Sequence, residues 1–305
     1  MLGPMALIAF LLLVETKVVQ ELFNLPACTP DGKSLKKYAW ISWYFYIIAA
    51  LYVVPDAILS HFSENSIGNL ISNKIWHWYI FTLYCAYCYG FCQSVRAMNT
   101  GSCQLELQRF CWAHMVTLWT IIQTYFVIRN IMAGLVWYVL PVTLVVCNDI
   151  SAYVCGKLFG VTQLCKLSPK KTLEGFIGAA IITLVFSVPL AHLLARHWYL
   201  ICPVTSLKVT IWHKPTCIPS AVLTPKEIEL LPEILKHSMN HMLNVNLSFT
   251  VAYNDFQIHA LVFGIFASFV APFGGLLASA IKRASQVKDF GYTTWLSFPT
   301  VRGEQ

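Results

Sequence analysis

Acidic residues are scarce in this chain, so the position of each one is informative. The 305 residues include 14 Asp and Glu against 21 Lys and Arg. Asp149 follows Asn148 directly after an apolar run, which would place its carboxylate at a membrane interface if that run spans a bilayer. Ionisable side chains at membrane depth are costly and are candidate functional residues, and carboxylate oxygens suit Mg²⁺. The alternative is an ordinary helix end that reaches water.

A second candidate is the basic segment 166–175. Ser168 is expected to cap a helix that has Pro169 at its first position. Lys170 and Lys171 would then lie in the first turn, where cations are unfavourable unless an anion is bound. Helix amides and two ammonium groups together would favour a phosphate. The alternative is a basic anchor before the next span.

A third candidate comes at the end of the last apolar segment. Ser279, Lys282 and Arg283 lie there, and Lys288 and Asp289 follow a few residues later. Two bases and a Lys-Asp pair at a membrane interface could hold a phosphate and a metal ion. The alternative is a membrane anchor whose long side chains extend to water.

The elements that position these groups are expected to be membrane-spanning helices. Hydrophobic residues make up 57% of the chain and charged residues 11%, whereas soluble proteins carry about 25% charged residues. This composition excludes a soluble fold and a disordered chain. Aromatic residues make up 14%, which favours belts at the two membrane interfaces. The eleven cysteines lack the spacing of a metal site or a disulfide framework.

The sequence therefore predicts an all-α, polytopic membrane protein. A spanning helix needs about 20 mostly apolar residues, and six segments qualify as full spans. They are residues 38–59, 75–95, 110–128, 131–147, 176–195 and 256–281. Residues 1–14 lack the basic start and cleavage site of a signal peptide, so we expect a partial span. Residues 1–291 are expected to form one membrane domain with loop 196–255 inserted, and residues 292–305 a separate tail.

The last span is rich in small residues at spacings of three and four. Such a face permits close helix packing, or contact with a second copy of the chain. Pro272 and the pair Gly274 and Gly275 are expected to kink this span.

The basic residues indicate an orientation. One set of alternating segments carries 14 Lys and Arg, and the other carries seven, of which five lie in loop 196–255. The first set comprises residues 15–37, 96–109, 148–175 and 282–305. Long loops are poor guides to membrane orientation, so the five basic residues of loop 196–255 are left out of the count. The remaining contrast is 14 basic residues to 2, and the first set is expected to face the cytosol. The luminal loop then contains a glycosylation sequon at Asn246 and two cysteines, Cys202 and Cys217, which could pair or stay free.

Three blocks in this order resemble the CDP-diacylglycerol synthases, or phosphatidate cytidylyltransferases, of eukaryotic type. The blocks are CNDISAYVCG at 147–156, KLSPKKTLEGFIG at 166–178, and PFGG followed by SxxKR and KDF within 272–290. Residues 3–7 also resemble the middle of that family's first span. The resemblance covers nearly the whole chain.

The resemblance implies transfer of CMP from CTP to phosphatidic acid, giving CDP-diacylglycerol and pyrophosphate for phospholipid synthesis. It implies Mg²⁺ as cofactor and a cytosol-facing active site in the endoplasmic reticulum membrane. Asp149, Lys288 and Asp289 would be the catalytic residues, with the two aspartates as metal contacts. The implied phosphate-binding residues are Ser168, Lys170, Lys171, Ser279, Lys282 and Arg283. The implied partners are CTP, phosphatidic acid, the bilayer and a second copy of the chain, and no nucleic acid.

The chain departs from this family pattern after Asp289. The family continues there with His-Gly-Gly and Asp-Arg-x-Asp elements, whereas residues 292–305 contain neither. We therefore expect a chain shortened at both ends relative to that family, with weak or no activity of its own. The alternative function is a catalytically impaired, lipid-binding or oligomer-forming subunit. A transporter is a third class, which the few polar residues in the spans disfavour.

Overall fold

The computed structural model describes residues 3–25, 39–62, 73–98, 103–165, 168–204, 217–224, 226–229 and 250–284. Long helices dominate these residues, and the strands form two small antiparallel hairpins. Five described helical segments are long and apolar enough to cross a membrane. They are Trp40–Leu59, Cys103–Ala133, Val136–Phe159, Leu173–Ala195 and Asp255–Ala284. The prediction of an all-α, polytopic membrane protein is therefore confirmed.

The five segments correspond to five of the six predicted full spans. The sixth, at 75–95, is also helical and lies within α3 (Asn73–Ala97), but its composition is less apolar. Six Tyr and Trp residues lower its hydropathy, and a full span at 75–95 stays a prediction. The partial span expected at 1–14 continues as helix α1 (Pro4–Asn24).

The chain divides into two compact units, and the first holds the N-terminal helices. These are α1, α2 (Ala39–Phe62), α3 and α4 (Cys103–Ala133). Val19 of α1, Tyr46 of α2 and Val116 of α4 are buried together in its core. The indole nitrogen of Trp112 donates a hydrogen bond to the Leu22 carbonyl at 2.8 Å, which ties α4 to α1. The prediction of one membrane domain at 1–291 with a separate tail stays a prediction.

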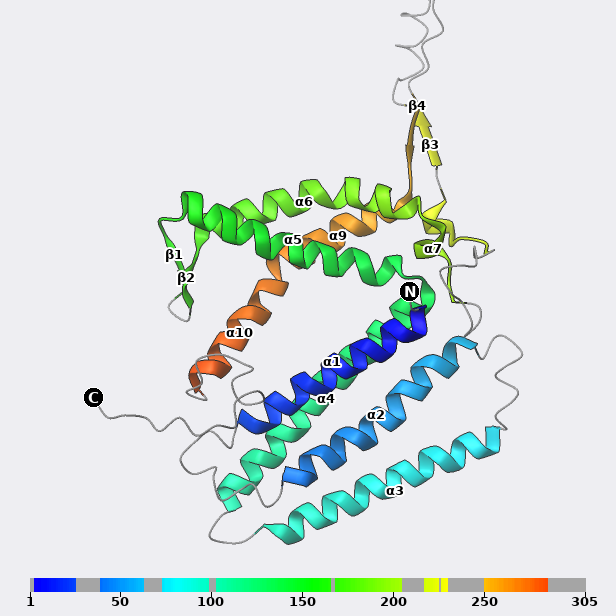
Figure 1. The fold of residues 1–305 in the computed structure, drawn as a ribbon, viewed down its shortest axis with the longest axis vertical. Coiled ribbons are helices and arrows are strands. Elements are labelled where there is room, and N and C mark those ends of the chain that lie inside the picture. Colours follow the sequence, from blue (N-terminus) through cyan, green and yellow to red (C-terminus); the bar gives the residue numbers. More distant parts are fainter. Residues whose placement is uncertain are drawn as a thin grey trace, which may run out of the picture. The chain divides into compact units, whose positions relative to one another are not determined.

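The second unit is built around three packed helices, α5 (Val136–Phe159), α6 (Leu173–Ala195) and α9 (Asp255–Phe269). Its buried core includes Leu140 and Leu144 of α5, Ala191 of α6, and Phe256 and Ala260 of α9. The hairpin of strands β1 (Gln163–Cys165) and β2 (Ser168–Thr172) lies at one end of this layer. The hairpin of β3 (Lys226–Glu229) and β4 (Thr250–Tyr253) lies at the opposite end (Figure 1).

The turn between α4 and α5 lies later than predicted. The sequence placed it between the spans 110–128 and 131–147, but α4 continues to Ala133 and α5 begins at Val136. Gly134 has φ of 142°, a backbone conformation that side chains disfavour. A Cβ there would also lie 3.3 Å from the carbonyl oxygens of Leu200 and Ile201. Both constraints explain why the chain turns at this glycine.

The last predicted span is broken where its proline predicted a kink. Helix α9 ends at Phe269, and α10 (Ala271–Ala284) begins two residues later. Pro272 lies in the first turn of α10, where its missing N–H costs little. The small-residue face packs within the chain: a Cβ on Gly264 would lie 3.4 Å from Leu184 and Ser187 of α6. The interpretation as a helix-packing face is therefore confirmed at Gly264 in α9, whereas Gly275 of the same face is exposed.

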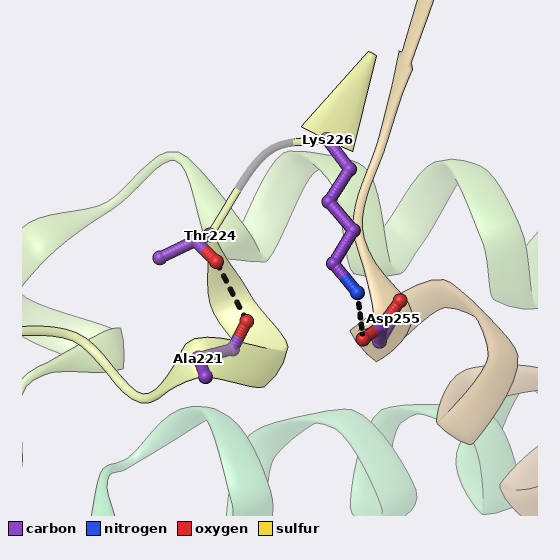
Figure 2. Close-up of polar contacts among 4 residues, drawn as sticks. All are labelled: Ala221, Thr224, Lys226 and Asp255. Carbon is purple, nitrogen blue, oxygen red and sulfur yellow. Dashed lines mark hydrogen bonds and ion pairs between the residues drawn. The ribbon is translucent and has the colours of Figure 1, made fainter. Parts of the chain in front are cut away.

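The long loop after α6 is tied together by a disulfide. Cys202 and Cys217 are bonded, with Cα atoms 5.8 Å apart, which resolves the alternative that the sequence left open. The β3–β4 hairpin is held to the start of α9 by a salt bridge of 2.6 Å between Lys226 Nζ and Asp255 Oδ2 (Figure 2). Hydrogen bonding to Asp255 raises the pKa of Lys226. The sequon at Asn246 lies outside the described residues.

Candidate active site

The second unit contains an open cavity of about 670 Å³. Three elements line it: the second half of α5, the β1–β2 hairpin with the start of α6, and the first turns of α10. All of its lining residues belong to this one unit. The shape of the cavity therefore depends on how α5, the β1–β2 hairpin and α6 are held together.

Helix α5 supplies one wall through residues spaced three or four apart. Asp149, Tyr153 and Lys157 line the cavity together with Ala152 and Gly156. This spacing places them on one helix face. The sequence placed Asp149 just after the predicted span 131–147, whereas helix α5 continues to Phe159; its place at the membrane interface stays a prediction. The Asp149 side chain is nevertheless exposed, which leaves its carboxylate available to a ligand.

Asn148 forms the buried part of the same wall. Its side chain is 3% exposed, and its Oδ1 accepts a hydrogen bond of 3.3 Å from Thr183 Oγ1 of α6, a residue with no exposed surface. Buried polar groups need such partners because an unsatisfied one is costly. The pair therefore fixes the orientation of the Asn148 amide beside Asp149 and joins α5 to α6.

The basic segment is a hairpin and not the predicted helix start. Residues Ser168–Thr172 form β2, which pairs with β1 through Gln163↔Thr172 and Cys165↔Ser168. Helix α6 begins only at Leu173, and its cap is Thr172, whose Oγ1 accepts from the Gly175 amide at 3.2 Å. The predicted cap at Ser168, and with it the placing of the lysines in a first helical turn, is therefore wrong.

Two predicted phosphate-binding residues of the hairpin do line the cavity. Ser168 and Lys171 lie on its wall with Thr172. Lys170 belongs to β2 as well, but its side chain lies outside what the structure describes. Lys171 and Lys157 thus bring two ammonium groups to the cavity that also contains the Asp149 carboxylate.

Glu174 holds the hairpin in place from the first turn of α6. Its carboxylate accepts hydrogen bonds from the backbone amides of Val161 and Thr162, each at 3.1 Å, and from the Thr162 hydroxyl. The Leu173 amide in turn donates to the Thr162 carbonyl at 3.0 Å. This carboxylate is therefore occupied in closing the turn between α5 and β1 and is not a free ligand.

Glycines let α5 and α6 approach each other at the base of the hairpin. A Cβ on Gly175 would lie 2.7 Å from the Ala152 carbonyl oxygen and 3.0 Å from Gly156 Cα. These distances are too short for a side chain, so the backbones themselves are in contact here. Small residues at helix contacts allow such close packing in membranes.

The start of α10 adds an apolar wall of Pro272, Phe273 and Leu276. Ser279, Lys282 and Arg283 lie further along the same helix, beyond the end of the second unit, and do not line the cavity described here. Lys288 and Asp289 lie outside the described residues. Of the predicted site residues, the structure therefore brings together Asp149, Ser168 and Lys171. It adds these neighbours, which the sequence did not single out: Asn148, Tyr153, Lys157, Thr172 and Phe176.

The cavity fits a metal ion that takes most of its ligands from a substrate. Among the described residues, no three His, Cys, Asp or Glu side chains cluster as a metal site. Asp149 is the only acidic side chain among the described residues that line the cavity. Mg²⁺ is commonly held by one or two carboxylates together with substrate phosphates and water. Asp149 meets that requirement.

Comparison with known proteins identifies the family. The profile of the cytidylyltransferase family matches residues 1–294. The chain belongs to this family. The prediction made from the three sequence blocks is therefore confirmed.

Relatives within this cytidylyltransferase family come from animals and plants. Phosphatidate cytidylyltransferase 1 of Arabidopsis thaliana is 34% identical over 299 residues, covering 95% of this chain and 67% of that protein. Phosphatidate cytidylyltransferase 1 of Rattus norvegicus is 33% identical over 298 residues, covering 96% and 62%. Phosphatidate cytidylyltransferase 2 of Homo sapiens is 32% identical over 295 residues, covering 96% and 64%. The chain thus spans about two thirds or less of the length of these relatives.

Proposed function

We propose that this multi-pass membrane protein transfers CMP from CTP to phosphatidic acid, giving CDP-diacylglycerol and pyrophosphate. The observation that carries the proposal is the cavity that joins Asp149, Lys157 and Lys171 to an apolar wall. The charged side chains of this lining suit phosphate groups, and its apolar side chains suit a lipid. The relatives are named for this activity, which favours an enzyme over a lipid-binding subunit.

The reaction needs positioning and charge neutralisation more than covalent help from the protein. An oxygen of the lipid phosphate attacks the α-phosphorus of CTP. The bond from that phosphorus to the bridging oxygen breaks, and pyrophosphate leaves with the electron pair. Lys157 and Lys171 would neutralise phosphate oxygens, and the Ser168 hydroxyl would donate a hydrogen bond to one of them. The apolar wall of Phe176, Pro272 and Phe273 would hold the glycerolipid part of phosphatidic acid.

The proposed cofactor is Mg²⁺, held by Asp149 and by substrate phosphates. When bound, this ion lowers the negative charge of the phosphates and stabilises the attacking and leaving oxygens. Asp289 stays a predicted second ligand and Lys288 a predicted catalytic residue. The other predicted phosphate contacts that remain are Lys170, Ser279, Lys282 and Arg283.

We place the cavity end of the second unit on the cytosolic face of the endoplasmic reticulum membrane. The 14 to 2 excess of basic residues in short segments supports this orientation. It suits both proposed substrates, because CTP is dissolved in the cytosol and phosphatidic acid lies in the adjacent leaflet. A second copy of the chain stays a predicted partner.

The test is CDP-diacylglycerol formation by the purified chain in mixed micelles of detergent and phosphatidic acid. We expect lipid product and pyrophosphate in equal amounts when CTP and Mg²⁺ are both present. ATP in place of CTP, diacylglycerol in place of phosphatidic acid, or chelation of the metal should each remove the product. Absence of a cytidine-linked lipid with all components present would overturn the proposal.

A further inference from the structure

Two adjacent glycines in the first turns of α10 have different surroundings. Gly274 and Gly275 are both exposed and both helical. A Cβ on Gly274 would have no described neighbouring atom within 4 Å. A Cβ on Gly275 would lie 3.0 Å from Lys171 Nζ, the only atom of the described residues that comes within 4 Å of it. The lysine extends from β2 to reach this point, so within the described part of the chain Gly275 faces the ammonium group and Gly274 faces no neighbouring atom.

Within the described residues, neither backbone conformation nor contact with another backbone segment accounts for glycine at position 275. Gly134 is the only described glycine with a positive φ. Glycine is also a poor residue for a helix interior. What a side chain at position 275 would displace is the ammonium group of Lys171. That group is the end of a flexible chain, so it can move away at little cost to the stability of the fold.

We infer that Gly275 is a positioning residue: its missing side chain leaves the space in which the Lys171 ammonium group sits at the edge of the cavity. Gly275 need not touch a substrate, because it acts through the lysine. This role rests on the proposed function, because it assumes that Lys171 binds phosphate. It explains why an otherwise unfavourable glycine follows the Pro-Phe-Gly segment at the cavity wall.

The matched pair Gly275→Ala and Gly274→Ala tests this inference in the full chain. Both changes add one methyl group to the same exposed helix and raise its helix propensity equally. We expect Gly275→Ala to weaken binding of inorganic pyrophosphate, measured by titration calorimetry in detergent, by about threefold, because it shifts one solvent-accessible charged group. Gly274→Ala should bind pyrophosphate like the wild type, and both variants should unfold at similar temperatures.

The same change in a Lys171→Met background separates positioning from a structural effect. If Gly275 acts through the lysine, Gly275→Ala should have no further effect on pyrophosphate binding there, which is a non-additive double-mutant cycle. Equal binding by the two alanine variants, or an undiminished effect of Gly275→Ala in the Lys171→Met background, would overturn the inference. Failure of the wild type to form CDP-diacylglycerol, with this pyrophosphate pattern intact, would overturn only the proposed function.

Discussion

At the scale of single residues, the buried pair of Asn148 and Thr183 is the support of the proposed metal ligand. Thr183→Val keeps the shape of the side chain but removes the hydroxyl that donates to Asn148 Oδ1. An acceptor left buried without a partner costs about 1–3 kcal/mol. We therefore expect a lower unfolding temperature in detergent and a reduced turnover, since the residue next to Asp149 loses its fixed orientation.

Thr183→Ser is the control for this prediction, because it retains the hydroxyl and loses only a methyl group. It should keep most of the turnover of the wild type. If the valine variant unfolds and turns over like the serine variant, the hydrogen bond does not support the site.

Residue types alone predicted part of the site. Asp149 was singled out because carboxylates are rare in this chain, Ser168 as an expected helix cap, and Lys171 as one of the basic residues after that cap. Asn148, Lys157 and Thr172 carry no such signal in composition. Lys157 could have been found from its spacing of eight residues after Asp149, which is close to two helical turns. The sequence could not locate it without the knowledge that α5 continues to Phe159.

At the scale of elements, Glu174 determines whether the β1–β2 hairpin stays closed on α6. Glu174→Ala would remove the acceptor for the amides of Val161 and Thr162. Because these hydrogen bonds to a charged acceptor close the turn between α5 and β1, their loss should make local opening of that turn more frequent. Hydrogen exchange followed by mass spectrometry should show this increase in peptides that contain Val161 and Thr162.

The β3–β4 hairpin at the other end of the unit is the internal reference for this measurement. Exchange in its strands should be unchanged in Glu174→Ala. Equal acceleration in both hairpins would mean that the whole unit is destabilised, and no acceleration at Thr162 would mean that the Glu174 contacts do not hold the turn.

The long helices were predictable because a bilayer requires long apolar segments, and their composition differs sharply from that of the loops. The β1–β2 hairpin was not predictable in this way. Ser168-Pro169 has the pattern of a helix start, while the actual cap, Thr172, stands four residues later. The pairing of two short strands depends on the Glu174 contacts and on the close approach of Gly156 and Gly175, which are tertiary features.

At the scale of the whole molecule, the proposed orientation predicts that the two ends of the second unit face different compartments. Val161 next to β1 is 90% exposed, and Ser220 next to the helical turn η3 (Ala221–Leu223) is also exposed. In sealed microsomes, an impermeant maleimide should label Val161→Cys directly. It should label Ser220→Cys only after the membrane is permeabilised, and peptide mass spectrometry separates these thiols from native cysteines.

The reverse pattern would invert the orientation, and labelling of both positions in sealed vesicles would contradict a membrane between them. The basic residues predict a cytosolic end because charge asymmetry between segments is visible in the sequence, and this orientation stays a prediction until the labelling is done. Pairing of Cys202 with Cys217 was only an alternative, because spacing alone does not bring two thiols together; the fold places their Cα atoms 5.8 Å apart.

The central claim is that the cavity containing Asp149 is where CMP is transferred. Its most direct test is CDP-diacylglycerol formation by the wild type, Asp149→Asn and Asp255→Asn, measured side by side. Radiolabelled CTP is used because the sequence predicts weak or no activity of this chain, so the assay must detect a small amount of product. Asp255 is the control, since it is a partly exposed acid at the other end of the same unit, and its solvent-exposed salt bridge to Lys226 contributes little to stability.

We predict that Asp149→Asn lowers turnover by about 100-fold, because metal ligation supplies several kcal/mol of transition-state stabilisation. Its unfolding temperature should stay close to that of the wild type, because the side chain is exposed. Asp255→Asn should retain its turnover. Wild-type turnover in Asp149→Asn, or an equal loss in both variants, would contradict the assignment of this cavity as the transfer site.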